Sequence, residues 1–180
     1  MKILAYLMFS AILSLSCSKS SSTSNDEVAT IEDLLVQNNE ITGWSYSGVS
    51  WVANNISELT EYINGMAEIY QKHGFTEGAQ QSYGGSIDGD GCTIQLIVYN
   101  MDTESNAKDM YDDPDLGLSG ATTWSDGAGS EAHYVRYGGL SQVMTFYSTN
   151  YFVYLQINFD SDESLNILKQ FALNVDGKME

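Results

Sequence analysis

One segment, residues 56–75 (ISELTEYINGMAEIYQKHGF), constrains the fold of this chain most, because it carries the full pattern of an amphipathic helix. Its apolar residues recur at intervals of three and four and fall on one stripe, namely Ile56, Leu59, Ile63, Met66 and Tyr70. Asn55 is placed to cap the first turn, Glu58 takes the capping-box position, and Gly74 suits the left-handed residue that ends a helix. We therefore predict one helix over residues 56–75, with an apolar face that packs on another layer.

The polar side of this helix contains one irregular feature, the pair Asn64-Gly65. A glycine inside a helix costs on the order of 1 kcal/mol relative to alanine. Two interpretations are open: the cost is simply tolerated, or another segment passes close over Gly65. The second interpretation predicts a covered face near Asn64 and Glu68. We name these two residues, together with Tyr83 and Trp124, as the candidate ligand-binding residues.

The rest of the sequence contains more predicted strands than predicted helices. Strands are expected over residues 41–53 (irregular), 76–85, 93–101, 131–137, 140–148 and 151–159, and helices over 31–36, over 105–111 and after 160–163. Gly138-Gly139 and Thr149-Asn150 supply tight connections, which make the last three strands antiparallel neighbours, and the Asp-Gly pairs at residues 88–91 indicate a hairpin turn before the strand over 93–101. This order predicts an α+β fold, an antiparallel β-sheet with helices packed on it, analogous to the PsbP/Mog1-like sandwich.

The chain is strongly acidic, with 24 acidic against 7 basic residues and a net charge of −17. Nucleic acid and anionic membrane surfaces would repel such a chain, so we expect neither as a direct partner. Solubility is the simplest consequence of this charge.

The N-terminal residues have the pattern of an export signal. Lys2 precedes an apolar run over residues 3–15, which is too short to span a membrane, and the run ends in LSLSC at Cys17. This sequence resembles the lipobox of bacterial lipoproteins, although Ser14 stands where an aliphatic residue is usual. The resemblance implies that Cys17 is acylated and becomes the first residue of the mature protein. An ordinary cleaved signal peptide is the alternative.

The chain therefore divides into a lipoprotein signal peptide (1–16), a lipidated cysteine with a Ser-rich tether (17–30) and a single α+β domain (31–180). We expect the protein in the bacterial cell envelope, held to the membrane through the lipid at Cys17. Ser18 after the cysteine indicates the outer membrane if the source is Gram-negative. Cys92 is then the last thiol of the mature chain, and we predict that it is buried and inert.

A family resemblance rests on LTEYINGMAEIYQKHGF at residues 59–75. This segment resembles the signature helix L-x-x-Y-I-N-G-x-A-E-x-Y-x-x-x-G-F of an uncharacterised family of secreted and lipid-anchored bacterial proteins. Tyr83, the strand TIQLIVYNMD and Ala107 follow in similar order and spacing. The resemblance implies the fold and export of the chain, and it implies no activity.

Aromatic residues suggest binding surfaces at two places, and each has a second interpretation. Trp44, Tyr46 and Trp51 either line a groove for a flat ligand such as a sugar or pack in the core. Trp124 stands alone in the Gly- and Ser-rich segment 116–130, where it is either a binding lid or a pin that holds the loop to the core.

No catalytic or cofactor-binding motif is present, so we expect no cofactor and lean against an enzyme. Acidic clusters at residues 88–90, 112–115 and 160–163 suit either turns and helix caps or calcium. We therefore expect a non-enzymatic binding module with a glycan, peptide or protein ligand. The alternatives are a hydrolase that uses carboxylates such as Glu68, and a calcium-binding structural protein of the envelope.

Overall fold

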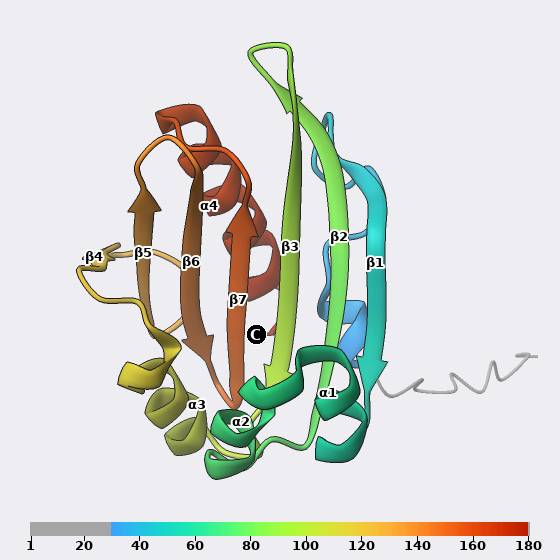
Figure 1. The fold of residues 1–180 in the computed structure, drawn as a ribbon, viewed down its shortest axis with the longest axis vertical. Helices are drawn as coiled ribbons and strands as arrows, with labels where there is room; N and C mark the ends of the chain where they lie inside the picture. The colour runs from blue at the N-terminus through green and yellow to red at the C-terminus, as the bar shows by residue number, and fades with distance from the viewer. Residues whose placement is uncertain (1–29, 180) are drawn as a thin grey trace, which may run out of the picture.

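Seven strands form one antiparallel sheet in the computed structural model, which describes residues 30–179 (Figure 1). The strands are β1 (Ser45–Ala53), β2 (Glu77–Ile87), β3 (Asp90–Asn100), β4 (Thr122–Thr123), β5 (Glu131–Tyr137), β6 (Ser141–Ser148) and β7 (Tyr151–Ile157), in the spatial order β1-β2-β3-β7-β6-β5-β4. The helices are α1 (Ile56–Ile63), α2 (Ala67–Lys72), α3 (Glu104–Tyr111) and α4 (Asp162–Asp176), with short 3-10 turns η1 (Ile31–Leu34), η2 (Asn64–Met66) and η3 (Pro114–Leu116). The predicted α+β class is confirmed.

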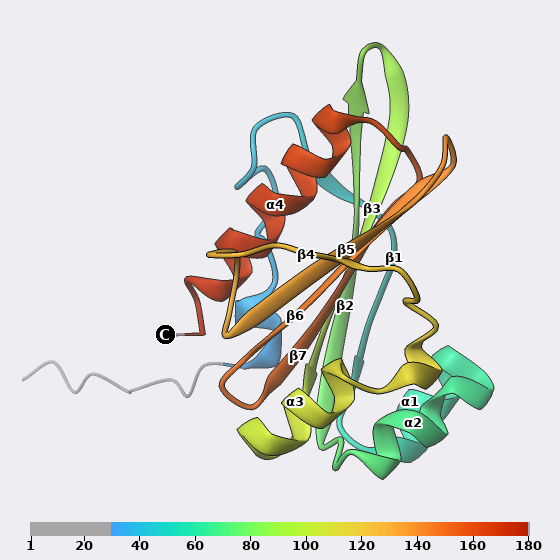
Figure 2. The same ribbon diagram turned by 90° about the vertical axis from the view of Figure 1, so that its left-hand side faces the viewer.

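Helix α4 covers one face of the sheet along much of its length (Figures 1 and 2). Its buried side chain Phe171 packs edge-on against Trp44 and Tyr83, at ring-centroid distances of 5.8 and 4.9 Å. Trp44 is therefore a core residue, and so is Trp51 on the opposite face, whereas Tyr46 is exposed. Of the two interpretations of these aromatics, core packing holds for both tryptophans.

Helices α1, α2 and α3 cover the other face at one end only, the lower end in Figure 1. There Leu59, Tyr70 and Met110 form a second core with Tyr99 and Phe152 of the sheet. Among the described residues, no helix covers the upper part of this face (Figures 1 and 2). We call this part the open face.

Burial on both sides explains the pattern of the central strand β3. Ile94 and Leu96 belong to the core under α4, whereas Ile97 and Tyr99 belong to the core under α1 and α2. Because successive side chains of a strand point to opposite faces, both sets of positions must be apolar where both faces are covered.

The predicted single helix over residues 56–75 is wrong, because the chain leaves the helix at Asn64. The backbone of Asn64 has φ 52° and ψ −133°, which separates α1 from α2. Asparagine tolerates a positive φ better than most residues, since its short polar side chain adapts to it. The second interpretation of Gly65 is wrong too: the residue is exposed, and an added Cβ would have no neighbour within 4 Å.

Both predicted ends of this segment are confirmed, but the predicted capping box is not formed, because the Glu58 carboxylate accepts from the backbone N–H of Asn54 and not from that of Asn55. The side chain of Asn55 accepts a hydrogen bond from the backbone N–H of Glu58. At the other end Gly74 has φ 75°, and the N–H of Phe75 donates to the carbonyl of Tyr70 at 3.1 Å. This is the Schellman arrangement, which satisfies the last carbonyls of a helix.

The predicted signal peptide, Cys17 and most of the predicted tether fall within residues 1–29, which lie outside the described residues. Within the described residues, no helix is long and apolar enough to cross a membrane. Cys92 is buried there as a free thiol, as predicted.

Candidate functional site

The four candidate ligand-binding residues do not share a cavity. Tyr83 is fully buried under α4, where its hydroxyl donates to the carbonyl of Val36 at 2.7 Å. Trp124 packs against the same core. Asn64 and Glu68 lie exposed near the opposite face, so the sheet separates the two pairs. Tyr83 lies apart from Asn64 and Glu68 because its side chain points to the face of β2 that α4 covers. The sequence does not show to which face of β2 this side chain points.

Trp124 holds its loop to the core and is not a lid. Its backbone N–H donates to the carbonyl of Ala132, and the Lys169 ammonium of α4 lies 5.1 Å from the centre of its ring. Glu68 is exposed, and no hydrogen bond joins its side chain to another described residue. The alternative of a hydrolase that uses Glu68 stays a prediction.

A groove opens where the helices meet the open face, and we call it the α1–α2 groove. Its volume is about 270 Å³. It is lined by Ile63, Met66 and Tyr70 of the interrupted helix, by Leu116 of η3, and by Gln95, Ile97, Tyr99 and Tyr154 of the sheet. Among these residues none carries a charged side chain, although the chain as a whole has a net charge of −17.

The floor of the α1–α2 groove is a set of closely packed tyrosines. The rings of Tyr70 and Tyr99 lie 4.2 Å apart, and Phe152 packs beneath Tyr99 at 6.1 Å. Burial raises the pKa of Tyr70 and of Tyr154 to about 12, and raises the pKa of Tyr99 well above its usual value. The phenols therefore stay neutral across the physiological pH range, and the groove stays uncharged.

The break at Asn64 shapes one wall of the groove. In a continuous helix Met66 would follow the stripe of Ile63 and Tyr70 into the core. After the break Met66 is 46% exposed and lines the groove, whereas Tyr70 remains buried. The Asn64-Gly65 irregularity lies on the polar side of the predicted helix, but its effect is on the apolar side, where it exposes Met66.

A row of polar side chains continues from the groove across the open face, and we call it the amide row. It comprises Trp51 of β1, Gln80 of β2, Gln95 of β3, and Tyr154 and Gln156 of β7. The indole Nε1 of Trp51 donates to Oε1 of Gln80 at 2.9 Å, and Nε2 of Gln95 donates to the same oxygen at 2.7 Å. The hydroxyl of Tyr154 donates to Oε1 of Gln156 at 3.3 Å.

The amide row was not predicted from the sequence. The available signal was a glutamine at alternate positions of otherwise apolar strands, as in Gln95 beside Leu96 and Gln156 beside Leu155. Polar residues at every second position indicate a strand face open to water. This pattern does not show that Gln80, Gln95 and Gln156, which belong to three different strands, lie close together on one face of the sheet.

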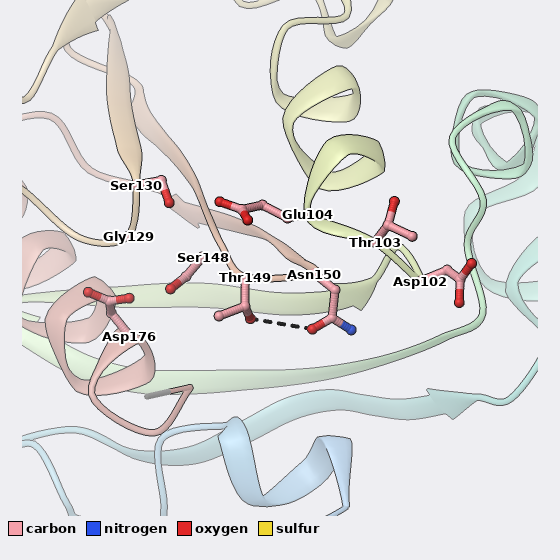
Figure 3. Close-up of a pocket in the computed structure, with 9 residues that line it drawn as sticks. All are labelled: Asp102, Thr103, Glu104, Gly129, Ser130, Ser148, Thr149, Asn150 and Asp176. Atoms are coloured by element: carbon pink, nitrogen blue, oxygen red, sulfur yellow. Dashed lines mark hydrogen bonds between the residues drawn. The ribbon is translucent and has the colours of Figure 1, made fainter.

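A larger hollow lies beside the β6–β7 turn, between the start of α3 and the end of α4 (Figure 3). Its volume is about 630 Å³, and its acidic residues are Asp102, Glu104 and Asp176. Figure 3 shows these carboxylates spread along the hollow, not converging on one point. Among the described residues, no three histidine, cysteine, aspartate or glutamate side chains are placed to hold a metal ion.

One hydroxyl–imidazole contact has the form of a catalytic pair. Oγ1 of Thr145 lies 2.8 Å from Nε2 of His133, whose ring packs on Tyr111 at 4.3 Å. Thr145 is fully buried, so no substrate can reach its hydroxyl. Burial also lowers the pKa of His133, which keeps the ring neutral at neutral pH. The contact belongs to the packing under α3.

Comparisons of the chain with protein-family models, with curated proteins and with solved structures find no match. The resemblance of residues 59–75 to a family of exported bacterial proteins and the lipobox at Cys17 therefore stay predictions.

Proposed function

We propose that this protein is a lipid-anchored binding module of the bacterial cell envelope, without enzymatic activity, and that it takes an uncharged ligand in the α1–α2 groove. One observation carries the proposal. In a chain of net charge −17, the hollow with an aromatic floor is lined without a single charged side chain. Ligand sites are typically apolar hollows with a few well-placed polar groups.

The combination of groove and amide row matches that description. Ile63, Met66 and Leu116 supply the apolar wall, and Gln95 supplies a polar group whose orientation is set by its neighbours. An ionic ligand would lose its hydration in this groove without gaining an opposite charge. A neutral ligand has no charge to desolvate, so its binding does not carry this free-energy cost.

Membrane attachment forms the second part of the proposal, and it is supported by the LSLSC sequence at Cys17. An acylated Cys17 would carry both a diacylglyceryl group and an amide-linked chain, which meets the requirement of two signals for stable anchoring. Expression of the full chain in a bacterium should yield a membrane-bound, lipid-modified protein. Cys17→Ser should abolish the lipid mass and the release of the signal peptide. A Cys17→Ser protein that is processed and membrane-bound like wild type would contradict the anchor.

The binding proposal is tested by methyl NMR of the full chain in detergent micelles, titrated with a library of uncharged small molecules. Compounds that bind should shift the methyl signal of Met66, which lines the groove, but not that of Met179 beside α4. Met66→Lys should weaken binding about tenfold or more, because it places a charge in the groove. The matched control is Leu140→Lys at an exposed apolar residue in the β5–β6 turn. Equal loss in both variants, or an unperturbed Met66, would refute the groove as the site.

A further inference from the structure

The indole N–H of Trp51 fixes the orientation of the amide groups in the row. An indole N–H is a donor only, so Gln80 must turn its oxygen toward Trp51. Because that oxygen also faces Gln95, Gln95 must turn its amide nitrogen toward Gln80. The carbonyl oxygen of Gln95 is then left as an acceptor, with no hydrogen-bond partner among the described residues.

A complementary donor lies beside this acceptor. Gln95 of β3 and Gln156 of β7 are register partners, so their side chains stand on the same face with Cβ atoms about 5 Å apart. Oε1 of Gln156 accepts from the Tyr154 hydroxyl, which leaves the amide nitrogen of Gln156 as a donor. The open face therefore presents one acceptor and one donor side by side, and both glutamines are only partly buried.

A flat apolar surface lies at the other end of the row. The ring of Tyr62 stacks on Trp51 with 7° between the planes and 5.0 Å between the centroids. Trp51 is buried beneath it, and Tyr62 is 47% exposed. From β1 to β7 the row crosses three strand intervals, which is roughly 14 Å.

These features together select a class of ligand. Neighbouring ring hydroxyls can each donate and accept, so they fit an adjacent acceptor and donor, and the apolar face of a sugar ring fits an exposed aromatic ring. An extended peptide would bind most readily by adding a strand at a sheet edge. The free amide groups of the row instead belong to Gln95 and Gln156, whose strands β3 and β7 are each paired on both sides.

The absence of charged side chains in the amide row limits the class of ligand further. None of the side chains of the amide row is charged, and the whole chain has a net charge of −17. A uronic or sulfated glycan would be repelled and would find no cation in the row. We propose that the open face binds an uncharged oligosaccharide along the amide row, with Gln95 and Gln156 bonding one sugar and Tyr62 stacking on another. This inference rests on the proposed function and names its ligand class.

The test uses the full chain in detergent micelles on an array of neutral oligosaccharides, with hexagalacturonate as the anionic probe and uncharged hexapeptides as the peptide probe. At least one neutral oligosaccharide should bind, and hexagalacturonate should not. Gln95→Ala and Gln156→Ala should each weaken that binding about tenfold, the loss of one good hydrogen bond. The matched control is Gln81→Ala, since Gln81 neighbours Gln80 on the same strand but points to the opposite face.

The outcomes separate this inference from the proposed function. If uncharged peptides or small molecules shift Met66 and no oligosaccharide binds, the saccharide is refuted and the binding module stands. If an oligosaccharide binds but Gln81→Ala weakens it as much as Gln95→Ala, the amide row is refuted. If neither array nor library produces binding, both proposals fall.

Discussion

At the scale of single residues, Asp113 joins two segments that frame the α1–α2 groove. Its side chain is only 2% exposed and lies 2.6 Å from Nε2 of His73 and 2.7 Å from Nζ of Lys72. It also accepts the backbone N–H of Asp115 at 2.8 Å. The hydrogen bonds from His73 and then from Lys72 hold its pKa well below its usual value. Asp113 thus ties the end of α2 to η3, which carries Leu116 into the groove.

Removing this carboxylate should destabilise the fold. We expect Asp113→Ala to lower the free energy of unfolding by about 2–4 kcal/mol, since a buried, multiply bonded charge is lost and its partners are left unpaired. The control is Asp112→Ala at the next residue, which is exposed and paired with Lys108, and which should cost at most about 1 kcal/mol. Urea denaturation measures both. Equal effects would show that Asp113 is an ordinary surface acid.

The pH dependence of the same carboxylate has a definite sign. Its folded pKa lies below the unperturbed value of 3.8, so the folded state binds fewer protons than the unfolded state in acid. The stabilisation is therefore present at neutral pH and is lost as the pH falls below about 4. The difference in stability between wild type and Asp113→Ala should shrink in acid, and urea titrations at several pH values measure it. A constant difference down to the lowest pH at which the protein folds would contradict the assignment.

At the scale of elements, the interrupted helix α1–η2–α2 decides where the groove opens. Its start at Asn55 and its end at Gly74 depend on local hydrogen bonds, and both were predictable. Its interior depends on Asn64, whose φ of 52° no continuous helix contains. The break exposes Met66 and leaves Tyr70 on the floor.

Substitutions at Asn64 distinguish a broken helix from a continuous one. Asn64→Ala should destabilise the protein by about 1–2 kcal/mol, because alanine disfavours a positive φ, and Asn64→Gly should be neutral or stabilising. A continuous helix would reverse that order, since alanine is the better helix former by about 1 kcal/mol. Glu61 inside α1 is the matched control, where alanine should exceed glycine. Thermal and urea denaturation of the four variants give the answer.

At the scale of the whole molecule, the sheet is covered unequally on its two faces. Helix α4 covers one face, whereas α1, α2 and α3 cover only one end of the other. The amide row and the α1–α2 groove carry amides and tyrosines and no carboxylate, in a chain with 24 acidic residues. The amide row and the α1–α2 groove therefore form an uncharged surface on an acidic protein.

The buried tyrosines make the whole fold sensitive to alkali. The pKa values of Tyr70, Tyr111 and Tyr154 are raised by burial from 10.0 to about 12. Between these values the unfolded chain has lost protons that the folded chain still binds, so stability falls as the pH rises. Urea midpoints should be level around neutral pH and should drop from about pH 10 upward. Tyr154→Phe should reduce the slope, and a wild-type midpoint that stays level to pH 12 would contradict the burial of these phenols.

The sequence by itself determined the features that depend on near neighbours along the chain. The caps at Asn55 and Gly74, the turn glycines and the alternation within strands each involve residues a few positions apart, so the α+β class followed from them. The tight connections also predicted the antiparallel neighbours β5, β6 and β7, and that prediction is confirmed. The tertiary structure alone decided which strands distant in the sequence lie side by side and which face each side chain meets. Strand β7 pairs with β3 across more than fifty residues of chain, and that pairing sets Gln156 beside Gln95. The packing of α4 buries Tyr83 on the face away from Asn64 and Glu68, because a strand's two faces become distinct only when other layers pack on them.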